Sequence, residues 1–379
     1  MRFNKIFFVQ LTGTRSSKGT GGGLEFHERL AKQLIRDGFD VFAITNNLDE
    51  SGFKFLEDRR LVANFRSFSE SIMSIFLFNP NKLKLELGRI IRETNFNSSV
   101  FVTIDPFPMD IFGAILLRQL GAIHIAITMY HITPSPLWHP FRRGIWRVFP
   151  AWLVSIFALS ISKIKELPLF LDNPRISVSS GWRINKLLDL PLALERYDHS
   201  LPDSRERIVV FTGRISYNKG VVDLIKAWKI ISEEVEDSKL ILIGTNHIQN
   251  KLLKLLRNYS VEKSVEIKGY IPNSEKELIL KHASIFLFPS YEEGWALSVM
   301  EAVDQGLLPL TYNLAAFDYL GDKAIRIKPG NYKEMAKKTI YYLQNSEERI
   351  QLIKEMQKQI SKYTMDYVTD HWINELEKI

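Results

Sequence analysis

Cysteine is absent from this chain of 379 residues. The absence excludes a disulfide framework, a zinc–thiolate site and a cysteine nucleophile, and it fits a reducing compartment. Long hydrophobic runs are also missing: the longest, Val148 to Ile161, is interrupted by Pro150 and two serines. It is shorter than the about 20 apolar residues that a membrane-spanning helix needs. The start, Met1 to Leu11, lacks the apolar core and cleavage site of a signal peptide, so we expect a cytoplasmic protein.

Motifs for metal-bound diphosphates and for common cofactors are missing too. The sequence has no Asp-x-Asp motif, and its glycine-rich stretch, Gly13 to Gly23, matches neither the P-loop pattern nor Gly-x-Gly-x-x-Gly in register. A P-loop or dinucleotide site is therefore disfavoured. We expect neither a metal ion nor a cofactor.

The positive charge is unevenly distributed. The net charge is +7, and residues 1–190 carry 24 Lys and Arg against 16 Asp and Glu, whereas residues 191–379 carry 26 against 27. A basic first half predicts an anionic partner, which leaves a membrane surface, a lipid phosphate and a nucleic acid open.

Apolar, strand-like runs alternate with helix-like segments along the whole chain, a pattern typical of parallel sheets covered by helices on both faces. The polar stretch 190–205, with two prolines, is the predicted linker between a first domain, 1–189, and a second, 206–360. The amphipathic segment 361–379 is a predicted helix that could complete the first domain. The predicted strands are Lys5–Leu11, Val41–Thr45, Ser99–Ile104, His124–Thr128, Ala158–Ser162, Arg207–Thr212, Lys239–Ile243, Ser264–Lys268, Ile285–Phe288 and Leu308–Thr311. The other predicted helices are Leu24–Asp37, Lys82–Thr94, Ile111–Leu120, Gly220–Glu234, Gln249–Asn258, Ser274–His282, Ala296–Asp304 and Lys333–Asn345.

Two acids flank a predicted helix N-terminus in the second domain. Glu293 and Glu301 lie eight residues apart, after the strand Ile285–Phe288, and Gly294 follows the first acid. The free N–H groups of the helix start near Gly294–Leu297 favour a phosphate, while carboxylates can accept hydrogen bonds from neutral hydroxyls. This combination fits a nucleotide-sugar.

A basic loop precedes another predicted helix. In the run from Gly213 to Gly220, Arg214 and Lys219 can converge on one anion if the loop folds back. An arginine fork and a lysine point charge are a common means of binding a diphosphate. A solvated basic loop is the alternative interpretation of the same residues.

These motifs, taken in order, resemble the donor-binding domain of the GT-B glycosyltransferases of family 4, a large retaining group. That family has Arg-x4-Lys after the first strand of its second domain and Glu-x7-Glu after a strand that ends Pro-Ser. The matching residues here are Arg214 and Lys219, Pro289-Ser290, and Glu293 and Glu301, with supporting matches at Gly269-Tyr270-Ile271 and Ala302…Gly306…Pro309.

The resemblance implies two Rossmann-like α/β domains that face each other across a cleft. It also implies a hexosyltransferase-type enzyme that moves a sugar from a nucleotide-diphosphate sugar, UDP- or GDP-linked, to a glycan or lipid-linked acceptor, with retention and without metal. The implied catalytic residues are Arg214, Lys219, Glu293 and His131. The expected donor-binding residues are Gly22, Gly23, Gly213, Tyr270, Ile271, Gly294, Trp295, Ala296, Leu297 and Glu301. Asp105 and Asp110 could bind acceptor hydroxyls.

The sequence departs from the family pattern at three places, one of which is the stretch 310–316, where the usual glycine pair is missing. Ala296 replaces a common glycine, and Ser180-Gly181-Trp182-Arg183 stands where the family has Asn-Gly, an apolar residue and Asp. The pattern therefore supports the class of reaction more than the identity of the sugar.

The segment 137–152 combines five aromatic residues with three arginines. This mixture suits an anionic membrane surface, and a nucleic acid or a buried helix would accept it too. The resemblance favours a peripheral enzyme on the inner face of the membrane and no nucleic-acid partner. The alternatives are a nucleotide-sugar epimerase or phosphorylase of the same fold, and a non-enzymatic, basic nucleic-acid-binding protein.

Overall fold

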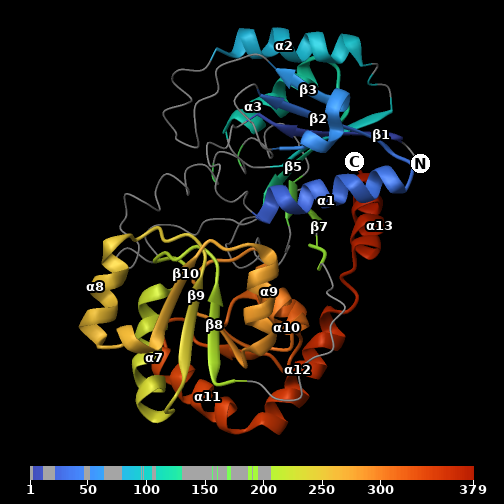
Figure 1. The fold of residues 1–379 in the computed structure, drawn as a ribbon. Coiled ribbons are helices and arrows are strands. Elements are labelled where there is room, and N and C mark those ends of the chain that lie inside the picture. The colour runs from blue at the N-terminus through green and yellow to red at the C-terminus, as the bar shows by residue number, and fades with distance from the viewer. Residues whose placement is uncertain are drawn as a thin grey trace. The chain divides into compact units, whose positions relative to one another are not determined.

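The structure is a computed structural model. It describes residues 3–11, 22–46, 52–63, 79–94, 96, 98–104, 108–129, 156, 160, 169–171, 187–189, 191–194 and 206–379. The chain divides into two compact units: Met1–Ala193 together with Met365–Ile379, and Leu194–Thr364. Each unit contains one parallel sheet with helices packed on it (Figure 1).

The first unit contains a sheet of seven strands in the order β3-β2-β1-β4-β5-β6-β7. Every pairing in it is parallel. The central strands are buried because their side chains are apolar on both faces, as parallel sheets require. The strands are β1 Lys5–Gln10, β2 Asp40–Asn46, β3 Arg60–Ala63, β4 Ser99–Thr103, β5 His124–Met129, β6 Leu169–Leu171 and β7 Leu187–Asp189, and the helices are α1 Gly22–Arg36, η1 Lys54–Arg59, α2 Pro80–Glu93, α3 Pro108–Gln119 and α13 Met365–Leu376.

Helix α13 belongs to this first unit although it is the last helix of the chain. Its Trp372 is fully buried and stacks on Phe8 of β1, with 5.7 Å between the ring centroids. His27 of α1 meets the same indole edge-on. Burial of aromatic surface therefore attaches the end of the chain to the first sheet.

The second unit contains six parallel strands in the order β10-β9-β8-β11-β12-β13. Sheet order reverses between β8 and β11, as it does between β1 and β4 in the first unit, and both sheets thus have Rossmann-type topology. The strands are β8 Ile208–Thr212, β9 Lys239–Ile243, β10 Val265–Gly269, β11 Ile285–Phe288, β12 Leu308–Tyr312 and β13 Ile325–Ile327, and the helices are α7 Val221–Glu234, α8 Asn250–Tyr259, η4 Glu262–Ser264, α9 Asn273–His282, α10 Leu297–Asp304, η5 Ala315–Leu320, α11 Tyr332–Gln344 and α12 Ser346–Ile360.

The prediction of two Rossmann-like α/β domains is confirmed. The predicted strand Ala158–Ser162 is wrong at Ser160, which is helical, and the strand that pairs with β5 is Leu169–Leu171. An apolar run of this length does not distinguish a strand from a buried helix by periodicity alone. No helix within the described ranges combines the length and the apolar character that crossing a membrane demands.

Candidate donor site at the switch point of the second sheet

The candidate site lies after β8 and β11, the two neighbouring strands at which the strand order of the second sheet reverses. In open parallel sheets, ligands bind outside the carboxyl ends of the strands at such a switch point. The loop that follows β8 contains Arg214 and Lys219, and the loop that follows β11 contains Glu293. Two motifs that are distant in sequence are thus brought together by topology alone.

The two loops contact each other through their backbones. Gly220, the residue before α7, has a φ of 73°, and a Cβ built on it would lie 1.9 Å from the carbonyl oxygen of Pro289. A side chain has no room there, and the left-handed conformation also favours glycine. The N–H of Tyr291 donates to the carbonyl of Asn218 over 2.9 Å. The two loops are therefore joined directly through their backbones.

Lys219 and Glu293 form an ion pair at the centre of this surface. Lys219 Nζ lies 2.5 Å from Glu293 Oε1, and the two side chains are 14% and 7% exposed. The ammonium also lies 5.8 Å from the ring centroid of Phe288, at the end of β11. Because each charge is largely removed from water, removal of either partner leaves a costly buried charge.

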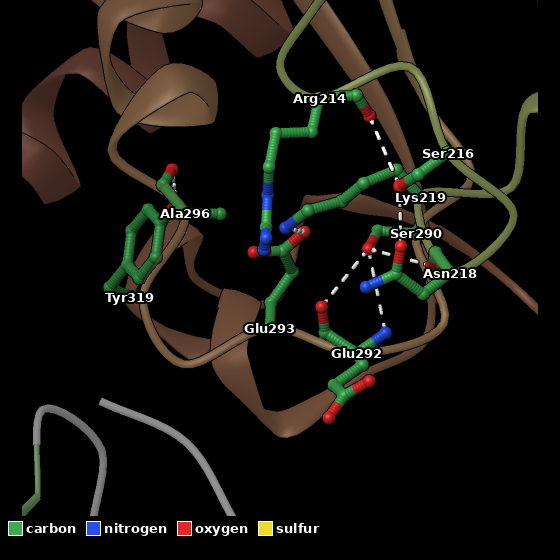
Figure 2. A network of polar contacts seen from close by, with 9 residues as sticks. All are labelled: Arg214, Ser216, Asn218, Lys219, Ser290, Glu292, Glu293, Ala296 and Tyr319. Carbon is green, nitrogen blue, oxygen red and sulfur yellow. Dashed lines mark hydrogen bonds and ion pairs between the residues drawn. The ribbon is translucent and has the colours of Figure 1, made fainter. Parts of the chain in front are cut away.

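Arg214 is exposed, and Figure 2 shows its side chain pointing toward Lys219 and Glu293. Ser290 and Asn218 lie on the other side of Lys219 in the same view, and Ser290 Oγ donates to the carbonyl of Glu292 over 3.1 Å. Two cations and one carboxylate thus share a small volume. An anion that enters has two positive groups within reach, the Lys219 ammonium and the Arg214 guanidinium.

Helix α10 starts at Leu297, four residues after Glu293. Ala296, the residue before the helix, adopts a left-handed conformation with φ 55° and ψ 66°. This conformation turns the chain from the loop of residues 289–296, called the acid loop below, into the helix, whose first-turn N–H groups begin at Leu297. The helix dipole favours negative charge at this end.

Glu301, the second acid, lies within α10. Its Oε2 accepts from Lys276 Nζ of α9 over 2.9 Å, and the two side chains are 25% and 16% exposed, Glu301 first. The acids that bracket the helix start therefore each have a lysine partner from a different element. Sequence spacing indicated the acids but gave no sign of Lys276.

Trp295 is part of the acid loop, and it is only 6% exposed. Its ring stacks on Tyr319 at 5.0 Å and meets Tyr363 edge-on at 5.2 Å. The Tyr319 hydroxyl donates to the carbonyl of Ala296 over 3.3 Å. Burial, and then the negative charge of Glu293, raise the pKa of Tyr319, so it remains a neutral donor. Trp295 thus supports the backbone of the loop.

The buried Asp223 of α7 is hydrogen-bonded to the same loop. Its Oδ2 accepts from the hydroxyl of Tyr312 over 2.6 Å and also from the hydroxyl of Tyr291, which is in the acid loop. Burial and the hydrogen bond to Asp223 raise the pKa of Tyr312. Asp223 was not predicted from the sequence. An acid in the first turn of a helix is common because the helix dipole favours it there, so its position alone does not indicate a contact with a distant loop.

The other predicted donor residues belong to both units. Tyr270 is 68% exposed after β10, Ile271 is half-buried beside it, and Gly213 follows β8 with φ 141°. Gly22 and Gly23 are the first two residues of α1 in the first unit.

Among the predicted acceptor residues, Asp110 is fully buried, and its Oδ1 accepts from the N–H of Leu11 over 2.6 Å. This carboxylate links α3 to the end of β1. His131, Asp105 and the segment 137–152 lie outside the described residues.

Comparison with known proteins agrees with this geometry. Residues 196–359 match the model of the family described as glycosyl transferases group 1. An uncharacterised glycosyltransferase of Methanocaldococcus jannaschii is 31% identical over 36% of this chain and 33% of its own length. The poly(glycerol-phosphate) alpha-glucosyltransferase of Bacillus subtilis is 25% identical over 44% of this chain and 23% of its own length. The chain thus spans about a third or less of these two relatives.

Solved structures match over the whole chain. HepE from Anabaena, in complex with UDP and glucose, gives a TM-score of 0.73 at 15% identity over 99% of this chain and 100% of that one. TarM from S. aureus, in complex with UDP and a GlcNAc-glycerol, gives 0.72 at 11% identity over 99% and 100%. The fold is the GT-B fold of two Rossmann-like domains. Within it, residues 196–359 are the part that is similar to the group 1 glycosyl transferases.

Proposed function

We propose that this protein is a hexosyltransferase-type glycosyltransferase that uses a nucleotide-diphosphate sugar, UDP- or GDP-linked. The observation that carries the proposal is the Lys219–Glu293 pair, with Arg214 beside it and the start of α10 next to it. The match to the group 1 family over the same residues supports it. A glycan or lipid-linked molecule is the proposed acceptor.

The transfer breaks the bond between the anomeric carbon of the sugar and the β-phosphate oxygen. A new bond joins the anomeric carbon to an acceptor oxygen, and the acceptor proton goes to the departing diphosphate. Negative charge develops on the leaving oxygen, and in this proposal Arg214, Lys219 and the N–H groups of α10 stabilise it. We propose that these groups suffice without a metal ion and that the configuration at the anomeric carbon is retained.

Glu293 is proposed to hold hydroxyls of the transferred sugar. In the ligand-free protein its charge is balanced by Lys219. A bound diphosphate would attract the ammonium, which would free carboxylate lone pairs for sugar hydroxyls. The pair would thus exchange one internal contact for two contacts with the donor, a gain made only when phosphate and sugar are both present.

A donor screen tests the proposal. UDP-, GDP-, ADP- and dTDP-sugars are added one at a time, and ligand binding is measured as a rise in the melting temperature. The hit is then incubated with candidate acceptors, and the products are analysed. Sugar transfer to an acceptor is the expected outcome. Conversion of the donor without acceptor would point to an epimerase, and formation of sugar phosphate from a glycan to a phosphorylase.

The basic first half and the segment 137–152 motivate a second part of the proposal, an acceptor site at an anionic membrane surface. The test is sedimentation with vesicles that contain anionic lipid. Binding that weakens with added salt is expected, and absence of binding at low salt would disprove membrane association while leaving the transferase proposal intact.

A further inference from the structure

Tyr363 lies where the chain passes between the two units, yet its side chain contacts the acid loop. The chain leaves the first unit after Ala193 and returns to it after Thr364, so Tyr363 lies one residue before the second of these connections. Its ring meets the indole of Trp295 edge-on, with 5.2 Å between the ring centroids and 83° between the planes. A residue at a connection thus contacts the loop that carries Glu293.

The backbone of Tyr363 is held at both of its polar groups. Its N–H donates to the carbonyl of Ile360 over 3.0 Å, and its carbonyl accepts from the N–H of Leu194 over 2.9 Å. Leu194 is the first residue after the other connection, and it is only 5% exposed. The two connections are therefore hydrogen-bonded to each other, and the ring of Tyr363 is attached to a backbone that both bonds hold in place.

Glu293 lies midway between two anchors of the acid loop. Two residues before it, the hydroxyl of Tyr291 donates to the buried Asp223 of α7. Two residues after it, the indole of Trp295 packs against the ring of Tyr363. The first anchor reaches a helix that covers the second sheet, whereas the second anchor reaches a turn at a connection between the units.

The second anchor matters because the backbone beside it is strained. Ala296, the next residue after Trp295, has a left-handed conformation, which a residue with a Cβ adopts only where the surrounding contacts impose it. Edge-to-face aromatic pairs are stabilising beyond the area that they bury. Loss of the Tyr363 ring would leave a void on one side of Trp295, into which this part of the loop can relax.

We propose that Tyr363 is a positioning residue for Glu293 and that it acts through Trp295. The ring holds the acid loop so that the Glu293 carboxylate meets the hydroxyls of the donor sugar. The proposed diphosphate contacts of Arg214 and Lys219 belong to the loop after β8 and do not depend on the ring. The inference rests on the proposed function, and it adds a residue on which sugar binding depends while diphosphate binding does not.

Titration calorimetry on the full-length protein tests the inference with two probes. The first is UDP, GDP, ADP or dTDP, whichever the donor screen selects, and the second is the sugar-bearing form of the same nucleotide. In Tyr363→Leu we expect an unchanged affinity for the nucleoside diphosphate and about ten-fold weaker binding of the nucleotide-sugar. Turnover should fall about ten-fold to hundred-fold, because a small displacement of a positioned group is costly in rate. Tyr363→Phe keeps the ring and should retain both wild-type values.

The matched control is Tyr367→Leu. Tyr367 is 42% exposed on α13, and its ring stacks on His371. This variant also replaces a tyrosine by leucine close to the end of the chain, and it should change neither the two affinities nor turnover. Melting temperatures show which variants are folded. If Tyr363→Leu does not fold, Tyr363→Met, which fills more of the void without a ring, is measured in its place with the same expectation.

The outcomes separate the inference from the function on which it rests. If wild type binds no nucleoside diphosphate, the proposed function fails. If folded Tyr363→Leu or Tyr363→Met keeps the wild-type ratio of the two affinities, the inference is wrong and the transferase proposal stands. The same holds if both affinities fall together, since Tyr363 would then have a general packing role.

Discussion

Both units bridge their switch point with a carboxylate, but they use it differently. In the first unit Asp110, at the start of the helix after β4, accepts from the backbone N–H of Leu11, which follows β1. In the second unit Glu293, in the loop after β11, pairs with Lys219, which follows β8. The strands β1 and β4 occupy the same places in their sheet as β8 and β11.

The partner decides what each carboxylate can do. Asp110 is fully buried and is held by a backbone N–H that cannot move away, so its bond is part of the fold. Glu293 retains some exposure, and its partner is the end of a flexible side chain that a phosphate can attract. The same topology thus provides a structural link in one unit and an exchangeable link in the other.

The largest expected effect is in the second unit. Glu293→Gln keeps the shape of the side chain but removes the charge that balances Lys219, and Lys219→Met removes the cation near the leaving phosphate. We expect each variant to lose about 10²–10³ in turnover, the range for loss of one electrostatic contact to a transition state. The measurement is initial rate with a saturating donor.

Melting temperatures distinguish loss of function from loss of fold in these variants. Lys254→Met, on the exposed face of α8, serves as the control. Turnover at the wild-type level in folded Glu293→Gln and Lys219→Met would refute the assignment of both residues.

The next effect is in the first unit. Asp110→Ala leaves the buried N–H of Leu11 without its acceptor, which costs about 1–3 kcal/mol of unfolding free energy. Denaturant unfolding measures it, and Asp110→Asn, which keeps an acceptor oxygen, should restore part of the loss. Nucleotide affinity should not change. An unchanged stability combined with a raised KM for the acceptor would instead favour the acceptor role that the sequence suggested for Asp110.

Much of the second sheet, and the candidate residues at its switch point, could be predicted from the sequence. Apolar runs gave β8, β9, β11 and β12 within one residue at each end, and the family pattern marked Arg214, Lys219, Glu293 and Glu301 as candidate site residues, a prediction that mutagenesis tests. The short strand β13 and the charged helix α12 were missed, because three residues or a mixed apolar pattern give little periodic signal.

The partners of the site residues could not be predicted. Lys276 meets Glu301 from 25 residues away, and Asp223 meets Tyr291 and Tyr312 from 68 and 89 residues away. Such contacts depend on how helices pack on the sheet, which no local pattern encodes. The packing of Trp295 could not be predicted for the same reason, since its ring partners are Tyr319 and Tyr363.

A smaller effect is expected at the support of the acid loop. Tyr312→Phe removes one of the two hydroxyls that Asp223 accepts from, while Tyr291 remains bound to it. We expect a loss of about 1 kcal/mol of unfolding free energy and a modest fall in turnover, because the Tyr291 hydroxyl still joins the loop that carries Glu293 to Asp223. Tyr341→Phe, which removes an exposed hydroxyl bonded to Glu348, is the control and should change neither quantity.

The smallest effect separates the backbone of the acid loop from its charges. Ala296 holds a left-handed conformation, which costs a residue with a Cβ about 1 kcal/mol more than glycine. Ala296→Gly should therefore raise the free energy of unfolding by up to about that amount, less the extra entropy of glycine in the unfolded chain. It also removes the Ala296 methyl group, which Figure 2 shows directed toward Arg214. If the methyl group limits the sugar pocket, the variant should accept a wider set of donors at similar turnover, measured as relative kcat/KM over a panel of nucleotide-sugars. An unchanged ranking with a raised melting temperature would mean that Ala296 shapes only the backbone, and that the charges alone distinguish this site from its structural counterpart at Asp110.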